Sequence, residues 1–176
     1  MAKREANQEL QKRLEERLRT ARKDGVAASW LAVESGGQKF LFPLTHAGEI
    51  FNAVLPHPVP YTQPWFLGVV GLRGGVLGVV DFSAFRQGLT ERSRVTTARG
   101  GARLIVLNLL FEVNCAILVD RLAGLRGVDG FAASDDATDA DPSYFGHRYT
   151  DLNGVPWQEI NLQQLSQRPD FLGIGA

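Results

Sequence analysis

Hydrophobic residues in this chain come in short runs, and two of these runs lie close together near the middle. Residues 69–72 and 76–80 are apolar at nearly every position and rich in β-branched side chains, which is typical of strands covered on both faces. Between them, Arg73, Gly74 and Gly75 can supply the positive φ angles of a tight turn. The pattern therefore predicts a buried β-hairpin, around which the rest of the chain is organised.

Further short apolar or alternating segments predict strands on both sides of that hairpin. In one of them Phe40, Phe42 and Leu44 alternate, and Pro43 indicates a strand edge or end. Asn153-Gly154 is the strongest short hairpin signal in the chain. The expected strands are 30–34, 38–44, 49–55, 69–72, 76–80, 103–109, 113–119 with a continuation over 120–125, 144–151 and 155–160. The predicted fold class is mainly β.

Three segments favour helix. Residues 5–23 lack Gly and Pro and carry three leucines at four-residue spacing among strong helix formers. This helix could dock on the body of the protein or bind a partner, because the stripe is too short to identify a coiled coil. Residues 82–87 predict one helical turn or more. Asn161 is expected to cap a short final helix that ends before Pro169.

Segments rich in Pro, Gly or charge are expected to be loops. Residues 56–64 contain four prolines, and residues 88–102 are polar, rich in arginine and interrupted by glycine, as in a linker. Residues 129–142 are acidic and rich in alanine. They lack the central Gly and terminal Glu of a calcium-binding loop, so we expect a solvated loop there.

The formal net charge is zero but unevenly distributed. Residues 1–24 carry eight basic and five acidic side chains, residues 25–127 nine and six, and residues 128–176 two and eight. No segment is basic enough to indicate a nucleic-acid partner. No apolar run approaches the roughly 18 residues of a membrane span, and the N-terminus is charged. We therefore expect a cytoplasmic protein without direct membrane insertion.

The sequence assembles no catalytic, cofactor or metal site. The glycine-rich stretch 68–78 lacks the Lys-Ser/Thr pair of a phosphate-binding loop. His46, His57 and His147 have no second ligand at metal spacing. The single cysteine, Cys115, has no basic neighbour to lower its pKa and is expected to be a plain buried thiol. These observations favour a binding module over an enzyme.

The aromatic residues leave open an alternative of another class, a small β-barrel that binds single-stranded nucleic acid. Trp30, Trp65 and Trp157 could stack on bases, and the linker carries several arginines. Each tryptophan lies in or next to an apolar run, however, which favours a place in the core or in a groove.

Arg73 is the one charged residue in the central apolar stretch. A guanidinium at the tip of an apolar hairpin is positioned to meet a carboxylate or backbone carbonyls of a partner. It could equally be an exposed turn residue that contributes little. Both alternatives stay open on these residues alone.

The central stretch resembles the signature of CheW-like domains, commonly Gly-Val-x-Asn-Leu-Arg-Gly, three apolar positions, Pro, two apolar positions and Asp. Residues 68–74 and 79–82 fill this pattern in register. Gly71 stands where the family usually has Asn, and Gly78 where it usually has Pro. Similarity extends to the family's opening strands over residues 32–50 and to a later apolar-Val-Asp strand over residues 118–125. Trp65, Trp157 and Phe171 resemble the branch of the family associated with type IV pili.

The resemblance implies a fold of two intertwined five-stranded SH3-like barrels. The CheW-like domain would cover residues 28–168, with a helical N-terminal extension over 1–25, a short C-terminal helix and a tail over 169–176. The linker at 88–102 would divide the two subdomains. The central hairpin would line the groove between the barrels.

The resemblance also implies a function, that of a non-catalytic adaptor without cofactors. Such adaptors couple the cytoplasmic tip of a methyl-accepting chemoreceptor to a CheA-type histidine kinase, at receptor arrays beneath the inner membrane. The pilus-associated branch points to control of twitching motility, with flagellar chemotaxis as the alternative. By motif position, the residues that contact or position a partner would be Val70, Leu72, Arg73, Gly74 and Asp81. Asp81 could instead only cap the turn that follows it.

Overall fold

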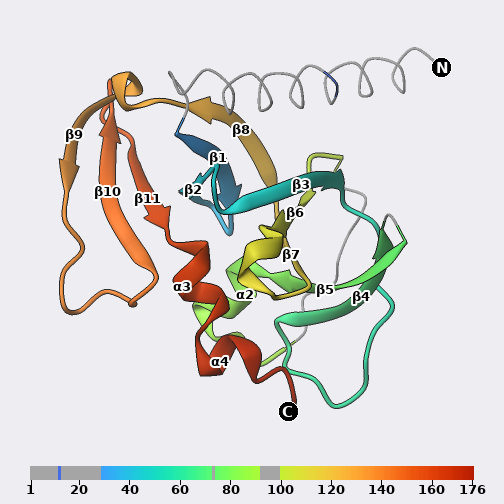
Figure 1. Cartoon of the computed structure of the whole chain (residues 1–176). Helices are drawn as coiled ribbons and strands as arrows, with labels where there is room; N and C mark the ends of the chain where they lie inside the picture. The colour runs from blue at the N-terminus through green and yellow to red at the C-terminus, as the bar shows by residue number, and fades with distance from the viewer. Residues whose placement is uncertain (1–11, 13–28, 73, 92–99) are drawn as a thin grey trace.

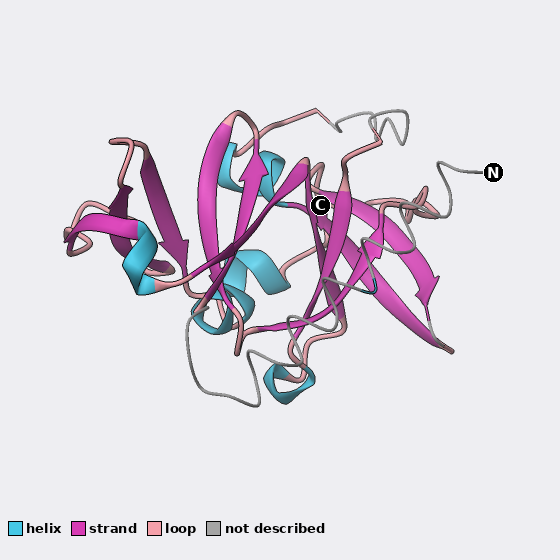
Figure 2. Ribbon diagram, turned by 90° about the horizontal axis from the view of Figure 1, so that it is seen from above, coloured by secondary structure: helices cyan, strands magenta, loops and turns pink. Residues whose placement is uncertain are grey.

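Two β-sheets packed against each other form the body of the protein in the computed structural model (Figure 1). The structure describes residue 12 and residues 29–72, 74–91 and 100–176. The helix expected over 5–23, the tip residue Arg73 and most of the linker arginines lie outside the described residues. Strands account for nearly half of the described chain, and its helices are short (Figure 2).

The first sheet has six strands in the order β8-β1-β2-β11-β10-β9. Its members are β1 (Trp30–Ser35), β2 (Gln38–Pro43), β8 (Arg121–Arg126), β9 (Phe131–Asp135), β10 (Phe145–Asp151) and β11 (Pro156–Ile160). Neighbouring strands are antiparallel except β11 and β2, which pair in parallel at only two positions.

The second sheet has five strands in the order β3-β6-β7-β5-β4. They are β3 (Ala47–Asn52), β4 (Phe66–Leu72), β5 (Gly75–Asp81), β6 (Arg103–Leu107) and β7 (Cys115–Val119). The described helices are α2 (Phe82–Gln87), α3 (Leu162–Ser166) and α4 (Pro169–Leu172), with single 3₁₀ turns η1 (Leu109–Phe111) and η2 (Val128–Gly130).

The order of strands confirms a mainly β, intertwined fold. The chain forms β1 and β2 of the first sheet, then all of the second sheet, and then returns to complete the first. The expected division at 88–102 is wrong, because β5 before this segment and β7 after it pair directly in one sheet. The crossings between sheets follow β2 and β7 instead.

The sixth strand, β9, corrects the expectation of a solvated loop over 129–142. Its backbone pairs with β10, for example Ser134 with Tyr149. Phe131 at its start packs against Trp30 and Tyr149, with ring centroids 5.7 and 5.1 Å apart. One aromatic anchor and a neighbouring strand thus order a segment whose other side chains are exposed. The first sheet therefore exceeds the expected five strands by one.

The predicted final helix is confirmed, but it is not the last. Asn161 caps α3 by accepting a hydrogen bond from the Gln164 N–H at 3.0 Å. Pro169, expected to begin a tail, instead begins α4. Proline is tolerated in a first helical turn because its missing N–H has no partner to lose there.

None of the helices among the described residues is long and apolar enough to cross a membrane.

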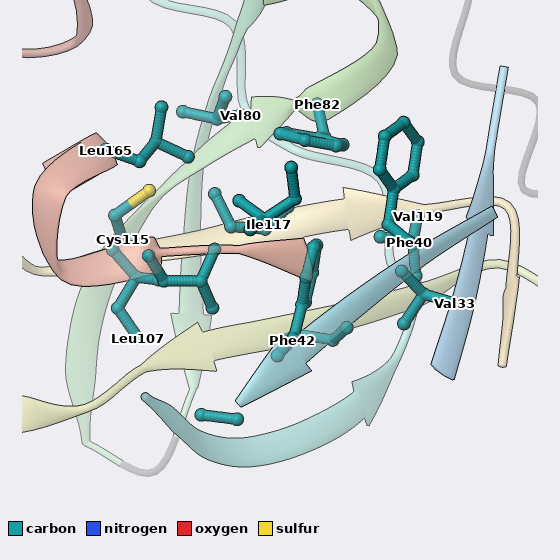
Figure 3. Packing of buried hydrophobic residues seen from close by; sticks show 14 of the residues in the cluster. Val33, Phe40, Phe42, Val80, Phe82, Leu107, Cys115, Ile117, Val119 and Leu165 are labelled. Carbon is teal, nitrogen blue, oxygen red and sulfur yellow. The ribbon is translucent and has the colours of Figure 1, made fainter. Parts of the chain in front are cut away.

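The main hydrophobic core lies between the two sheets (Figure 3). Phe40 and Phe42 of the first sheet meet Phe82 of α2 edge to face, with ring centroids 5.0 and 5.7 Å apart. Alternate residues of each strand point away from this core. These residues form two smaller clusters, one on the opposite face of each sheet.

Three tryptophans and one thiol belong to these buried clusters. Trp30, Trp65 and Trp157 are all buried, as the apolar sequence around them predicts, and cannot serve as exposed stacking surfaces. Cys115 lies in the main core, where burial raises the pKa of its thiol to about 12. The expectation of a structural thiol is confirmed.

The Asn153-Gly154 turn is held by one buried carboxylate. Oδ1 of Asp151 accepts hydrogen bonds from the N–H groups of Asn153 and Val155, both at 2.9 Å, and Oδ2 accepts one from the Trp157 indole N–H at 3.1 Å. These bonds lower the pKa of Asp151 below its usual range. The bond to Trp157 therefore stabilises the turn against β11, in addition to the two hydrogen bonds within the turn itself.

Candidate partner-binding surface

The central hairpin consists of β4 and β5, which pair antiparallel as the sequence predicts. Leu72 lies opposite Gly75, and Val70 lies opposite Leu77. At the tip, Gly74 is exposed and has a φ of 76°, in the left-handed region that glycine adopts without strain. Arg73, the other tip residue, lies outside the described residues.

Val70 and Leu72 point away from the other sheet. Both belong to the cluster on the opposite face of the five-stranded sheet, with Val70 only 3% exposed and Leu72 partly buried. Neither side chain therefore fills the space between the two sheets. The space between the sheets is filled by the alternate residues of the same strands, including Phe66 and Val80.

The structure adds Val76 to the residues expected from the sequence. Its side chain is 64% exposed. It lies opposite Gly71, which has no side chain to cover it. The uniformly apolar composition of the run 76–80 predicts that all of it is buried. The signal that could have separated Val76 from the rest is its place next to the turn, opposite a glycine. We call Leu72, Val76 and Leu77 the apolar rim of the hairpin.

A β-bulge sets the course of β4, and Gly68 makes it possible. The register shifts between Phe66 and Gly68, where Gly68 has a φ of 133°. A Cβ atom at Gly68 would collide with the carbonyl oxygen of His57. That residue pairs with Val69 through two backbone hydrogen bonds of 2.8 and 2.9 Å, so the proline-rich loop covers the outer edge of β4. Covering an edge strand protects it from pairing with other chains.

Gly78, the departure from the usual family proline, has a clear physical basis. Its N–H donates to the Asn114 carbonyl oxygen at 2.9 Å, a bond that proline cannot make. A Cβ atom at this position would lie 2.8 Å from the ring of Phe66. The large ring and the small residue therefore complement each other across the hairpin.

Asp81 uses its carboxylate within the chain. Oδ1 accepts a hydrogen bond from the Ala84 N–H at 3.0 Å and so caps α2. The Asp81 N–H donates to the Trp65 carbonyl oxygen at 2.9 Å. Burial raises the pKa of this carboxyl above its ordinary value of 3.8, and the charge of Asp120 adds to the effect. The structure thus places Asp81 at the base of the hairpin as a helix cap.

Substitution of Asp81 tests this capping role. We expect Asp81→Ala to lower the free energy of unfolding by about 1 kcal/mol, the usual cost of a lost N-cap. Asp81→Asn keeps the acceptor and removes the buried charge. Because the folded pKa is raised, the wild type loses stability as the pH rises from about 4 through the folded pKa. Asp81→Asn should lack this loss and equal or exceed the wild type at pH 7 in urea denaturation. If Asp81→Asn were less stable than Asp81→Ala, the assignment of Asp81 as the cap of α2 would be wrong.

The candidate metal ligands stay apart. His147 lies between Asp136, 2.9 Å from its Nε2, and Glu159, 3.5 Å from its Nδ1. His46 packs edge to face on Phe111, and His57 belongs to the proline-rich loop. Within the described parts of the chain, no three His, Cys, Asp or Glu residues are grouped as a metal site would require.

Comparison with known proteins identifies relatives along most of the chain. The family model described as "CheW-like domain" matches residues 29–170. "Protein PilI" of Pseudomonas aeruginosa is 26% identical over 152 residues, which cover 84% of this chain and 82% of that protein. "Chemotaxis protein CheW" of Rhizobium meliloti is 39% identical over 54 residues, which cover 31% of this chain and 35% of that protein.

A solved structure confirms the fold. The scaffolding protein TtCheW from Thermoanaerobacter tengcongensis matches with a TM-score of 0.58 at 15% sequence identity, covering 77% of this chain and 89% of that chain. At this level of identity the likeness concerns the arrangement of the sheets.

Proposed function

This chain belongs to the CheW-like domain family, whose members are non-catalytic scaffold proteins, and from that premise we propose that it couples a chemoreceptor to a CheA-type histidine kinase. The observation that carries the proposal is the family match, which spans both sheets and the whole central hairpin. A scaffold needs surfaces in place of convergent acids, bases or metal ligands, which agrees with the dispersed histidines described above.

The output of this pathway is, in our proposal, the twitching motility driven by type IV pili. The similarity to PilI covers more than four-fifths of both chains, whereas the similarity to the Rhizobium CheW covers about a third. Because the CheW segment has the higher identity, flagellar chemotaxis remains the second candidate. Deletion of the gene distinguishes them: we expect loss of the twitching zone with swimming unchanged, and the reverse result would favour the second candidate.

The receptor tip is proposed to bind at the end of the central hairpin. Leu72 and Val76 offer apolar surface there, and the guanidinium of Arg73, next to Gly74, would meet carboxylates or carbonyls of the receptor. Val70 is buried in the cluster on the same face of the sheet, next to the hairpin end, and Asp81 caps α2 at the base of the hairpin. These two residues therefore position the surface rather than contact the receptor.

A matched pair of substitutions tests the site. Val76→Glu places a charge in the apolar rim, and Val128→Glu makes the same change at a valine of 67% exposure on η2, compared with 64% for Val76. Binding of a receptor-tip fragment and of the kinase regulatory domain is measured by calorimetry. We expect Val76→Glu to weaken receptor binding at least about tenfold, since a charge would lose its water in the interface. Val128→Glu should bind as the wild type does.

The two parts of the proposal fail in different ways. If the wild-type chain bound neither partner, the adaptor function would be wrong. If it bound both and the two valine substitutions had the same effect, only the placement of the receptor site would be wrong. Circular dichroism of each variant shows that the fold is retained.

A further inference from the structure

A cavity of about 480 Å³ is lined by residues of α2, of the loop before β4, of the loop before β10 and of α4. Its lining includes Trp65, Phe85, Arg86, Tyr144, Arg168 and Asp170. We call this space the α2–α4 cavity. Its volume is within the range of small-molecule sites, and neither the hairpin nor the scaffold function accounts for it.

One wall of the α2–α4 cavity is a rigid group of aromatic rings. The Trp65 ring lies 5.1 Å from Phe85, edge to face, and 6.0 Å from Phe171, stacked. Phe85 also meets Phe171 edge to face at 5.3 Å. Rings packed in this way hold each other in place, so the parts of Trp65 and Phe85 that face the cavity offer an apolar contact at little entropic cost to a ligand.

Arg168 contributes a fixed and already compensated charge. Its Nε and Nη2 atoms donate to the two carboxylate oxygens of Asp170 at 2.8 and 2.7 Å. Its Nη1 atom donates to Ser143 Oγ at 2.9 Å, and its guanidinium lies 5.3 Å from the centre of the Tyr144 ring. The pair with Asp170 is bidentate, so it neutralises Arg168 and holds it in place.

Arg86 contributes a charge that nothing compensates. It makes no ion pair with any described carboxylate, its Nε atom is buried without an acceptor, and its guanidinium lies 5.5 Å from the centre of the Phe40 ring. The Tyr144 hydroxyl likewise has no hydrogen-bond partner among the described residues. It lies close enough to Arg86 and Arg168 that both charges lower its pKa, although burial raises that pKa overall. Arg86 is half-buried, and its buried Nε–H gains a charge-assisted hydrogen bond when an anion lies beside it.

We propose that the α2–α4 cavity binds a small monocarboxylate that carries a flat aromatic group. The carboxylate accepts from the Arg86 guanidinium and the Tyr144 hydroxyl, and the ring lies on the wall of Trp65 and Phe85. A single negative charge matches the single uncompensated cation. The C-terminal segment lies beside the cavity, because Ile174 and Ala176 pair with the 61–63 loop through backbone hydrogen bonds of 2.7 and 2.9 Å, next to the lining residues Gln63 and Gly173. The cavity is open to solvent on one side, and its volume suits a small molecule.

The test compares phenylacetate with its uncharged analogue phenylacetamide on the full chain. Titrations are followed by NMR of the backbone amide and tryptophan indole N–H signals. We expect saturable shifts with phenylacetate and at least about tenfold weaker binding of the amide, because the amide lacks the charge that pairs with Arg86. This comparison needs no variant and so does not depend on a variant that folds.

Two variants locate the site. Arg86→Gln should weaken phenylacetate binding at least about tenfold, as expected for a lost charge-assisted bond. Arg148→Gln is the matched control, because Arg148 is exposed and lines the neighbouring cavity on the other side of Arg86. It should bind as the wild type does. Absence of saturable shifts, equal binding of acid and amide, or equal weakening by both arginine substitutions would overturn the proposal. Should Arg86→Gln not fold, Tyr144→Phe replaces it, with a several-fold loss expected.

Discussion

Gly68→Ala is expected to lower the free energy of unfolding by more than about 3 kcal/mol, the largest effect expected for alanine at any glycine that the structure describes. Gly68 has a φ of 133°, which other residues rarely adopt, and its missing side chain faces the His57 carbonyl. A methyl group would push the proline-rich loop off β4 and break the two backbone bonds between His57 and Val69. Urea denaturation of the purified variant measures the loss.

Gly71→Ala is the matched control for this prediction. Gly71 lies on the same strand, but its φ is not positive and no atom lies within 4 Å of a Cβ atom built there. Alanine at such a site should leave stability unchanged or raise it by up to about 1 kcal/mol, because glycine loses more backbone freedom on folding. Equal losses at Gly68 and Gly71 would show that the bulge is not what demands glycine.

Gly78→Pro, which restores the usual residue of the family, is expected to be the second most damaging change. It removes the 2.9 Å hydrogen bond from Gly78 to the Asn114 carbonyl and drives ring atoms into Phe66, whose edge lies 2.8 Å from a Cβ atom at this position. We expect a loss of about 3 kcal/mol or more, measured by thermal or urea denaturation. In this chain, therefore, the family residue would be harmful.

The companion substitution, Gly71→Asn, also restores a usual family residue and should be tolerated. The position is exposed and open, so we expect a change within about 1 kcal/mol of the wild type. If Gly78→Pro were as stable as Gly71→Asn, the packing of Phe66 against Gly78 would not explain why this chain has glycine where the family usually has proline. The double variant Phe66→Leu/Gly78→Pro would then be no more stable than Gly78→Pro alone.

Both predictions concern the same feature, a hairpin whose course is set by two glycines far from its tip. Gly68 lets the covering loop approach β4, and Gly78 lets Phe66 of β4 lie across β5. Together they fix how the apolar rim is presented at the tip. A rigid hairpin loses less freedom when a partner binds, which favours affinity.

Local chemistry allowed much of the fold to be predicted. The turn at Asn153-Gly154 and the cap at Asn161 depend on residues within a few positions of each other, and both were predicted from the sequence. The capping role of Asp81 was one of two alternatives, and the structure shows the cap. Strand β9 was missed because its composition is that of a loop, and a distant strand and the ring of Trp30 order it.

The central hairpin was predicted in position but not in orientation. The hairpin tip was predicted correctly in the middle of the chain. A uniformly apolar run, however, does not indicate which face of the strand packs against the other sheet. Val70 and Leu72 could be assigned to the outer face only once the register with β5 and the contents of the core were known. The exposure of Val76 follows from the same register.

The sequence by itself determined most of the strands, the turns, two helix caps and the resemblance to a family, because each depends on residues close together in the chain. Only the tertiary structure decided which side of the hairpin faces the core and how the sheets share their strands. It also decided that Arg86 and Tyr144 meet at one cavity. These features arise from contacts between segments tens of residues apart, which depend on strand pairing and on the volumes of side chains that no local pattern specifies.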